Sequence, residues 1–190
     1  MFKVVPAAAF ALVACLFVPA AQAQVPVRVG VIPIVGAAPF FVADGAGWLK
    51  EAGMQTRVTT FESGPNAIQA LASGTIDVYV AGVMPLAVAR SKGVESKVVT
   101  ATAIEEMVFV AGPKLAPYFA EGVSAADALK AFRAKEGKAA RLAAQPPGSV
   151  PNTTLQHWLY AVSKADKADT DIVSMGIDAT QQAVLAGAVE

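Results

Sequence analysis

The sequence is poor in the side chains that most often carry chemistry. It has one cysteine, Cys15, and one histidine, His157. A single cysteine cannot form a disulfide within the chain or a site of several thiolate ligands. The sequence also has no His-rich metal spacing, no G-x-S-x-G elbow and no Walker A loop. His157 stands beside Trp158 in a predicted helix, so we interpret it as a packed or surface residue. We therefore predict a protein that is not an enzyme and has no cofactor or metal.

Charge is scarce and balanced. Charged residues make up 16% of the chain, with 15 Lys and Arg against 15 Asp and Glu. A nucleic-acid surface would show as a basic stripe, so the composition argues against a nucleic-acid partner. The length permits one large domain or two small ones.

The first 23 residues predict a secretory signal peptide. Lys3 supplies a positive start, residues 4–18 are almost wholly apolar, and Ala21-Gln-Ala23 has the small-x-small pattern of a cleavage site. The apolar stretch is shorter than the roughly 18 residues of a membrane-spanning helix. We expect export, cleavage near Ala23 and a soluble mature chain. One alternative stays open, because Leu12-Val-Ala-Cys15 resembles a lipobox in which Cys15 would carry a lipid anchor.

From Val25 onwards, short apolar runs alternate with amphipathic helical patterns, which is typical of an α/β fold with a mostly parallel sheet. Three predicted helices end at Gly53, Gly74 and Gly93, each followed closely by a strand. The predicted strands cover 27–32, 55–60, 77–81, 97–103, 107–111, 141–144 and 171–174. The predicted helices cover 39–52, 65–73, 85–92, 124–133, 152–163 and 178–186, the last with Asp178 as its N-cap. We predict two lobes, lobe 1 from 24 to 106 and lobe 2 from 107 to 190.

One segment of lobe 1 returns in lobe 2. Residues 66–77 correspond to residues 179–190, with Gly74 aligned on Gly187 and Asp77 on Glu190. The offset is 187 − 74 = 113 residues, whereas solenoid repeats have periods of about 20 to 50 residues. We interpret the repeat as two similarly built lobes. Because the second copy stops where a strand should begin, we also expect the chain to be truncated at its C-terminus.

Four loops at the carboxyl ends of strands form the candidate site. Ligands bind at this edge of open α/β sheets, and each loop runs into a helix whose N-terminal N–H groups can bind an anion. Gly, Pro, Ser and Asn are also ordinary turn and cap residues, so the hypothesis depends on the four loops as a set. The loops cover 33–39, 62–66, 82–85 and 145–154. The candidate ligand-binding residues are Pro33, Gly36, Ala38, Pro39, Ser63, Gly64, Asn66, Gly82, Met84, Gly148, Ser149, Asn152 and Thr153.

Several motifs resemble one protein family. Val29-Gly-Val-Ile-Pro33, Gly47-Trp-Leu-Lys-Glu-Ala-Gly53 and Ala70-Leu-Ala-Ser-Gly-Thr-Ile-Asp77 are similar to the opening lobe of ABC-transporter solute-binding proteins. The group they resemble is the nitrate, sulfonate, taurine and thiamine-precursor (NMT1-like) group. Residues 143–154 resemble the strand and glycine loop at the binding edge of the second lobe. The resemblance implies a two-lobed periplasmic binding protein of type II architecture, which captures a small molecule between its lobes by hinge closure.

The resemblance also implies a location and partners. It implies a monomeric periplasmic protein that delivers its ligand to a membrane permease. The ligand stays open, because the four loops contain no Arg or Lys and a sulfonate or other small anion would depend on helix N-termini. The acids Glu62, Glu105 and Glu106 would instead suit an amine or a heteroaromatic nitrogen. Two alternatives are a pyrimidine-synthesising enzyme of the same fold and the ligand-binding domain of a sensory receptor.

Overall fold

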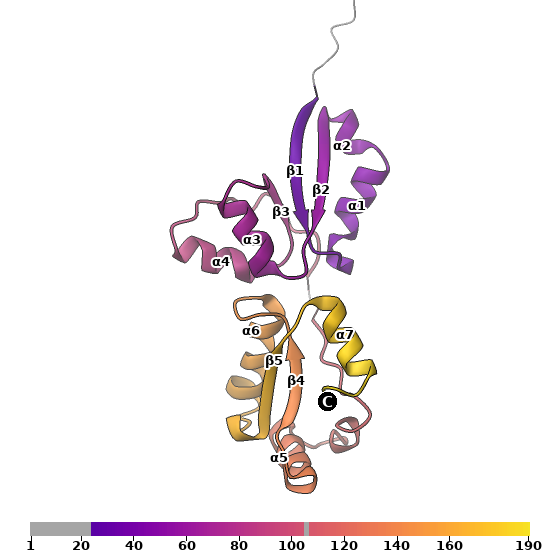
Figure 1. Cartoon of the computed structure of the whole chain (residues 1–190), viewed down its shortest axis with the longest axis vertical. Helices are drawn as coiled ribbons and strands as arrows, with labels where there is room; N and C mark the ends of the chain where they lie inside the picture. The colour runs from indigo at the N-terminus through magenta and orange to yellow at the C-terminus, as the bar shows by residue number, and fades with distance from the viewer. Residues whose placement is uncertain (1–23, 105–106) are drawn as a thin grey trace, which may run out of the picture.

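The computed structural model describes residues 24–104 and 107–190. Within them the chain forms two α/β units, one built on a three-stranded sheet and the other on a two-stranded sheet (Figure 1). The predicted signal peptide, the lipobox residue Cys15 and the two acids Glu105 and Glu106 lie outside the described residues. The boundary at 106/107 therefore stays a prediction, and we keep the names lobe 1 and lobe 2 for the two units.

The sheet of lobe 1 is wholly parallel. The strand β1 (Val25–Val31) lies between β2 (Met54–Thr60) and β3 (Val78–Val80). Figure 1 shows α1 (Ala38–Gly45) and α2 (Trp48–Glu51) on one side of these strands, with α3 (Gly64–Ala72) and α4 (Val83–Ser91) on the other. The central position of β1 explains why its apolar residues Val29 and Val31 are buried.

Glycines in the left-handed backbone region end the helices of lobe 1. Gly53, Gly74 and Gly93 have φ angles of 80°, 73° and 86°, which glycine adopts without the steric cost of a β-carbon. The three predicted helix ends are thus confirmed. The prediction of one helix over 39–52 was wrong, because Gly47 also has a left-handed φ of 82° and separates α1 from α2.

Lobe 2 has a parallel pair of strands with helices around it. β4 (Ala140–Ala144) pairs with β5 (Thr170–Ser174), and the helices are α5 (Ala125–Glu136), α6 (Val150–Gln156) and α7 (Ile177–Leu185). The predicted helix over 124–133 extends to Glu136, where Gly137 ends it with a φ of 70°. The predicted helix over 152–163 is α-helical only to Gln156 and continues as a π-helix, His157–Val162. Short 3₁₀ turns cover Val35–Ala37, Ala116–Tyr118 and Lys167–Asp169.

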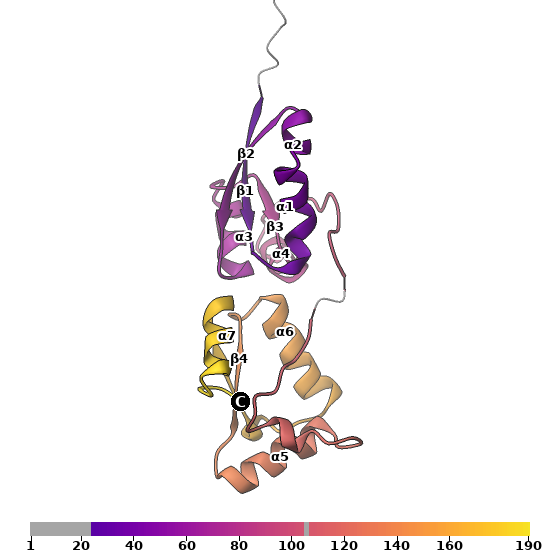
Figure 2. The same cartoon turned by 90° about the vertical axis from the view of Figure 1, so that its right-hand side faces the viewer.

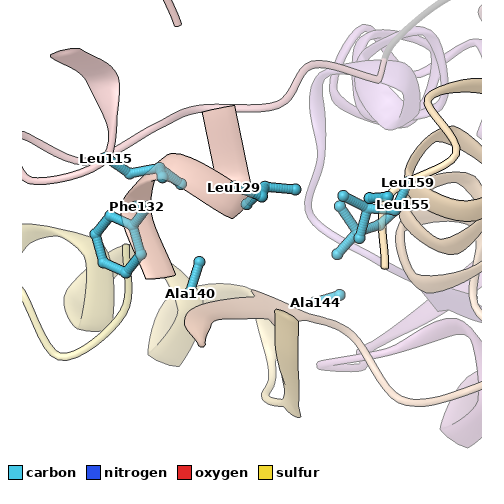
Figure 3. Packing of buried hydrophobic residues seen from close by; sticks show 8 residues of the cluster. Leu115, Leu129, Phe132, Ala140, Ala144, Leu155 and Leu159 are labelled. Carbon is cyan, nitrogen blue, oxygen red and sulfur yellow. The ribbon is translucent and has the colours of Figure 1, made fainter. Parts of the chain in front are cut away.

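The core of lobe 2 joins α5 to the sheet and to α6. Leu129 and Phe132 of α5 are 1% and 0% exposed. Figure 3 shows Leu129 pointing toward Leu155 and Leu159, the residues that the α6 helix and its π-helical extension contribute. Burying a large apolar side chain contributes about 1.5 to 3 kcal/mol to stability, so this cluster accounts for much of the cohesion of the lobe.

Two predicted strands are absent from the described part of the chain. Residues 97–103 and 107–111 form neither helix nor strand there, and Figure 2 shows both stretches as irregular chain. Val99 and Val108 are 81% and 75% exposed. Strand propensity measures how well a side chain fits a paired, half-buried surface, and no strand pairs with either segment among the described residues. The short apolar runs therefore predicted two strands that the tertiary structure does not provide with partners.

Candidate functional site

The carboxyl ends of the two sheets face each other. In Figure 1 the arrowheads of β1 and β2 point toward lobe 2, and the arrowhead of β4 points toward lobe 1. Because the strands within each sheet are parallel, the loops that follow them gather at these two facing edges. Each of these loops leads into a helix, so the N-termini of α1, α3, α4, α6 and α7 are directed toward the same region. Helix N-termini carry unpaired N–H groups and a partial positive charge.

The two predicted serines, Ser63 and Ser149, are helix N-caps. Each is 1% exposed. The Ser63 Oγ accepts a hydrogen bond from the Asn66 N–H at 3.4 Å, and the Ser149 Oγ accepts one from the Asn152 N–H at 3.3 Å. Both serines have extended backbone angles, as an N-cap requires. Both hydroxyls therefore act as helix caps within the protein, as the alternative interpretation of these residues as turn and cap residues predicted.

The asparagines that donate to these caps differ in exposure. Asn66 is exposed, whereas Asn152 is buried and its Oδ1 accepts a hydrogen bond from Gln156 Nε2 at 2.6 Å. Thr153, one position later in α6, is half-buried. Of these predicted residues, Asn66 and Thr153 keep side chains that are at least partly exposed.

The first predicted loop lies at the carboxyl end of β1. Pro33, Ala38 and Pro39 are exposed, and Gly36 is buried within the 3₁₀ turn that precedes α1. Its backbone is fixed to the sheet by the Ile32 N–H, which donates to the Val80 carbonyl at 3.2 Å. This loop offers backbone groups and apolar surface without a charged side chain.

A residue that the sequence analysis did not select, Tyr79, joins the other two loops of lobe 1. Its hydroxyl donates to the Gly82 carbonyl at 2.9 Å. A β-carbon at Gly64 would lie 3.1 Å from the same hydroxyl, so Gly64 leaves the room that this side chain occupies. Burial raises the pKa of Tyr79, which keeps the phenol protonated as a donor. The sequence placed Tyr79 only within the predicted strand 77–81 and gave no signal of this role.

The loops of the two lobes touch. A β-carbon at Gly82, the N-cap of α4, would overlap with Val150 at the start of α6. A β-carbon at Gly148 would meet Val88 of α4 at an ordinary contact distance of 3.7 Å. The structure thus brings together two of the predicted glycines, one from each lobe, along the contact between α4 and α6. Met84, in the first turn of α4, is half-buried.

A second contact involves a loop that the sequence analysis missed. Gly176 is the N-cap of α7, so the prediction of Asp178 as the cap was wrong, and Asp178 lies in the first turn instead. A β-carbon at Gly176 would lie 2.9 Å from Oε2 of Glu62, which belongs to lobe 1. The repeat offset could have identified this loop, because 63 + 113 = 176 aligns Gly176 with the N-cap Ser63 of α3.

Other features of the described residues bear on function. A cavity of about 870 Å³ lies within lobe 2 and is lined mainly by apolar side chains of residues 107–111, α6 and α7. It shares Gln145 and Pro151 with the predicted loop 145–154.

Between residues 24 and 190, leaving out 105 and 106, no group of three or more His, Cys, Asp or Glu could hold a metal ion. In the same part of the chain no helix has the length and apolar character needed to cross a membrane.

Comparison with known proteins identifies the family. The model of the NMT1-like family matches residues 20–190, and the chain therefore belongs to the NMT1-like family. The alkanesulfonate-binding protein SsuA from Xanthomonas axonopodis pv. citri, solved with MOPS bound, has a similar fold, with a TM-score of 0.57 at 20% identity. The periplasmic aliphatic sulphonate binding protein SsuA from Escherichia coli gives a TM-score of 0.52 at 19% identity. Each match covers 88% of this chain and 53% of the solved chain, so this chain spans about half of their length. No curated protein matches the chain. The predicted fold class, the α/β fold of two-lobed periplasmic binding proteins, is confirmed.

Proposed function

We propose that this protein is an exported solute-binding protein, which captures a small molecule between its two lobes and delivers it to the permease of an ABC transporter. The observation that carries the proposal is the arrangement of the two parallel sheets, whose carboxyl edges face each other across the helix N-termini (Figure 1). Ligands of open α/β sheets bind at this edge, and membership of the NMT1-like family supports the same role.

The facing loops suit recognition of a ligand by backbone groups. The loops 33–39, 62–66, 82–85, 145–154 and 175–178 contain no Lys or Arg, and their only charged side chains are Glu62 and Asp178. An anionic group on the ligand would be bound by N–H groups at helix N-termini, with Asn66 and Thr153 as side-chain partners. Several such hydrogen bonds suffice for micromolar affinity, which corresponds to about −8 kcal/mol.

The ligand we propose to test first is a small organic sulfonate, because two proteins of the same fold are named as sulfonate-binding. Other small anions, amines and heteroaromatic compounds are the comparison set. Amines are included because Glu62 and Asp178 are acidic.

A thermal-shift screen of the full chain tests the proposal. A ligand that binds only the native state at 100 times its Kd stabilises it by about 2.7 kcal/mol, so we expect a clear rise in Tm for one class of compound. Titration calorimetry then confirms stoichiometry and affinity. A screen in which no class raises the Tm would contradict the proposal of solute capture.

We also propose that the protein is periplasmic and monomeric, with its signal peptide removed near Ala23. Expression of the native gene followed by N-terminal sequencing of the secreted protein should give Gln24 as the first residue. Recovery of a lipid-modified protein beginning at Cys15 would instead establish the lipoprotein alternative.

Mixing the ligand-loaded protein with permease-containing vesicles should stimulate the transporter's ATPase, and no stimulation would contradict delivery to a permease.

A further inference from the structure

Two glycines at the facing loops have backbone angles that do not require glycine. Gly82 has φ −69° and ψ 154°, and Gly176 has φ −69° and ψ 170°. Both conformations lie in the β region that every L-residue adopts. They differ in this from the helix-ending glycines such as Gly74, whose φ is positive. The backbone angles therefore do not require glycine at these two positions, which leaves packing against neighbouring residues as a constraint.

The opposing lobe supplies that constraint at both positions. A β-carbon at Gly82 in lobe 1 would overlap with the side chain of Val150 in lobe 2. A β-carbon at Gly176 in lobe 2 would lie 2.9 Å from Oε2 and 3.3 Å from Cβ of Glu62 in lobe 1. Each glycine lies at an N-cap, where the helix terminus approaches the other lobe, and each faces a side chain of that lobe. A β-branched side chain such as Val150 has few other rotamers to move into, and rotation of the Glu62 side chain does not move its Cβ away from residue 176.

The Gly176 contact also has an electrostatic component. Gly176 offers no side chain to cap α7, and the Glu62 carboxylate lies beside this uncapped N-terminus. A negative charge near a helix N-terminus is favourable because of the helix dipole. Glu62 of lobe 1 thus adds an attraction between the lobes at the point where the missing β-carbon allows them to approach.

We propose that Gly82 and Gly176 determine how closely the two lobes approach, and that a side chain at either position holds the lobes apart. This inference rests on the proposed function in one respect, because it gives the lobe approach a role in closing on a ligand. In that role the two glycines act as positioning residues. They need no contact with the ligand, and they allow the loops of both lobes to reach it at once.

Distance measurement between spin labels tests the inference without any ligand. The labels are attached to Glu51→Cys on α2 and Lys130→Cys on α5, both exposed positions in different lobes, in a Cys15→Ser background of the full chain. We expect Gly82→Ala and Gly176→Ala each to shift the distance distribution to longer values. Gly45→Ala is the matched control, because no atom lies within 4 Å of a β-carbon there, and its distribution should equal that of the parent.

Two double variants separate a wedge between the lobes from a local folding defect. Val150→Ala removes the side chain that would overlap with residue 82, and Glu62→Ala removes the carboxylate beside residue 176. Gly82→Ala with Val150→Ala should return the distribution toward that of Val150→Ala alone, and Gly176→Ala with Glu62→Ala toward that of Glu62→Ala alone. Single variants that match Gly45→Ala would overturn the inference, and so would double variants that remain as shifted, or as poorly folded, as the singles.

The failure of this inference is distinguishable from failure of the proposed function. If the single variants open and the ligand screen finds nothing, the lobe contact stands and solute capture fails. If a ligand binds and the variants keep the parental distances, only the role of the glycines fails. If the variants open and a ligand also binds, the single variants should raise the Kd as the fraction of closed molecules falls. The Kd should rise about tenfold when one molecule in ten remains closed.

Discussion

Arg28 in β1 and Asp77 just before β3 bind each other through both backbone and side chain. The Arg28 N–H and Nε donate to Asp77 Oδ2 at 2.8 and 2.9 Å, and Nη2 donates to Oδ1. The Asp77 N–H in turn donates to the Arg28 carbonyl at 2.8 Å. This exchange fixes the start of β3 against the central strand of lobe 1.

The same exchange recurs 113 residues later. The Arg141 N–H donates to Glu190 Oε2 at 2.6 Å, and the Glu190 N–H donates to the Arg141 carbonyl at 2.8 Å. The offsets agree, because 141 − 28 and 190 − 77 both equal 113. Burial opposes ionisation of Glu190, but hydrogen bonds from Lys138 Nζ and the Arg141 N–H outweigh it and lower the pKa of its carboxyl. The repeat seen in the sequence is therefore a repeat of hydrogen bonding as well as of helix pattern.

Acid should weaken lobe 1 through Asp77. Hydrogen bonds from Arg28 lower the pKa of Asp77 from 3.8 to about 2. A group whose pKa is lower in the folded state stabilises it above the unfolded pKa, and this stabilisation is lost as the pH falls through the folded pKa. We expect the stability of the parent to fall between about pH 4 and pH 2, with a smaller fall in Asp77→Asn. Urea unfolding at a series of pH values measures this, and equal slopes would contradict the assignment.

The core of lobe 2 should be sensitive to loss of Phe132. The side chain is fully buried and stacks edge-on against Tyr118, with ring centroids 5.5 Å apart. Phe132→Ala should lower the free energy of unfolding by about 3 to 5 kcal/mol. Leu185→Ala is the control, since Leu185 is 74% exposed, and its unfolding midpoint should stay near that of the parent. A similar loss in both variants would mean that this cluster is not the core of the lobe.

Removal of the Ser149 hydroxyl, which caps α6, should lower the stability of the protein. Its buried hydroxyl accepts the Asn152 N–H, so Ser149→Ala should destabilise the protein by about 0.5 to 2 kcal/mol. Ser149→Gly should lose only a few tenths of a kcal/mol, because glycine is tolerated at N-caps. Thermal unfolding of the two variants decides the matter, and equal Tm values would rule out a capping role.

Lys164 has a backbone conformation that glycine would adopt at lower cost. It is the only non-glycine residue with positive φ, 57°, among residues 24–104 and 107–190. The left-handed conformation costs an L-residue about 1 to 2 kcal/mol, so Lys164→Gly should stabilise the protein by about 1 kcal/mol. Lys130→Gly, within α5, should instead destabilise it by about 1 kcal/mol. Chemical denaturation that shows both variants destabilised would contradict the strain at Lys164.

Thr153 tests the loop of lobe 2 as a ligand contact. Ser149→Ala with Thr153→Ala should weaken binding of the compound found in the thermal-shift screen by about 1 kcal/mol or more, the value of one or two hydrogen bonds. Ser149→Ala alone shows how much of this loss comes from the cap. Thr100→Ala, at an exposed position in the crossing segment, is the control for calorimetric titration. Unchanged affinity in the double variant would remove this loop from the binding site.

Local signals predicted most of the secondary structure. Gly53, Gly74 and Gly93 end their helices as predicted, because a left-handed residue next to a helix is a property of a few neighbouring positions. The same kind of signal failed at Gly47, where a second left-handed glycine inside the pattern split the predicted helix. The spacing of apolar residues predicts a helix but does not reveal the backbone angle of a single residue such as Gly47.

The candidate site was predictable in outline only. The loops could be placed because parallel strands put their carboxyl ends at one edge of a sheet, and the structure shows those edges facing each other. Gly176 escaped notice because its loop has no distinctive residue besides the glycine, and Tyr79 because a strand tyrosine is indistinguishable from a core residue in sequence. Ser63 and Ser149 were selected as ligand partners, whereas their hydroxyls are engaged as caps.

The sequence by itself determined the alternation of helices and strands within the two lobes, the helix ends at Gly53, Gly74 and Gly93, and the repeat at 113 residues. These follow from interactions between residues close in the chain and from the comparison of one segment with another. Only the tertiary structure decided that 97–103 and 107–111 remain unpaired, that Arg141 repeats the pairing of Arg28, and that Gly82 and Gly176 meet side chains of the opposite lobe. Each of these depends on residues far apart in the chain coming into contact, and such contacts leave no trace in local composition or periodicity.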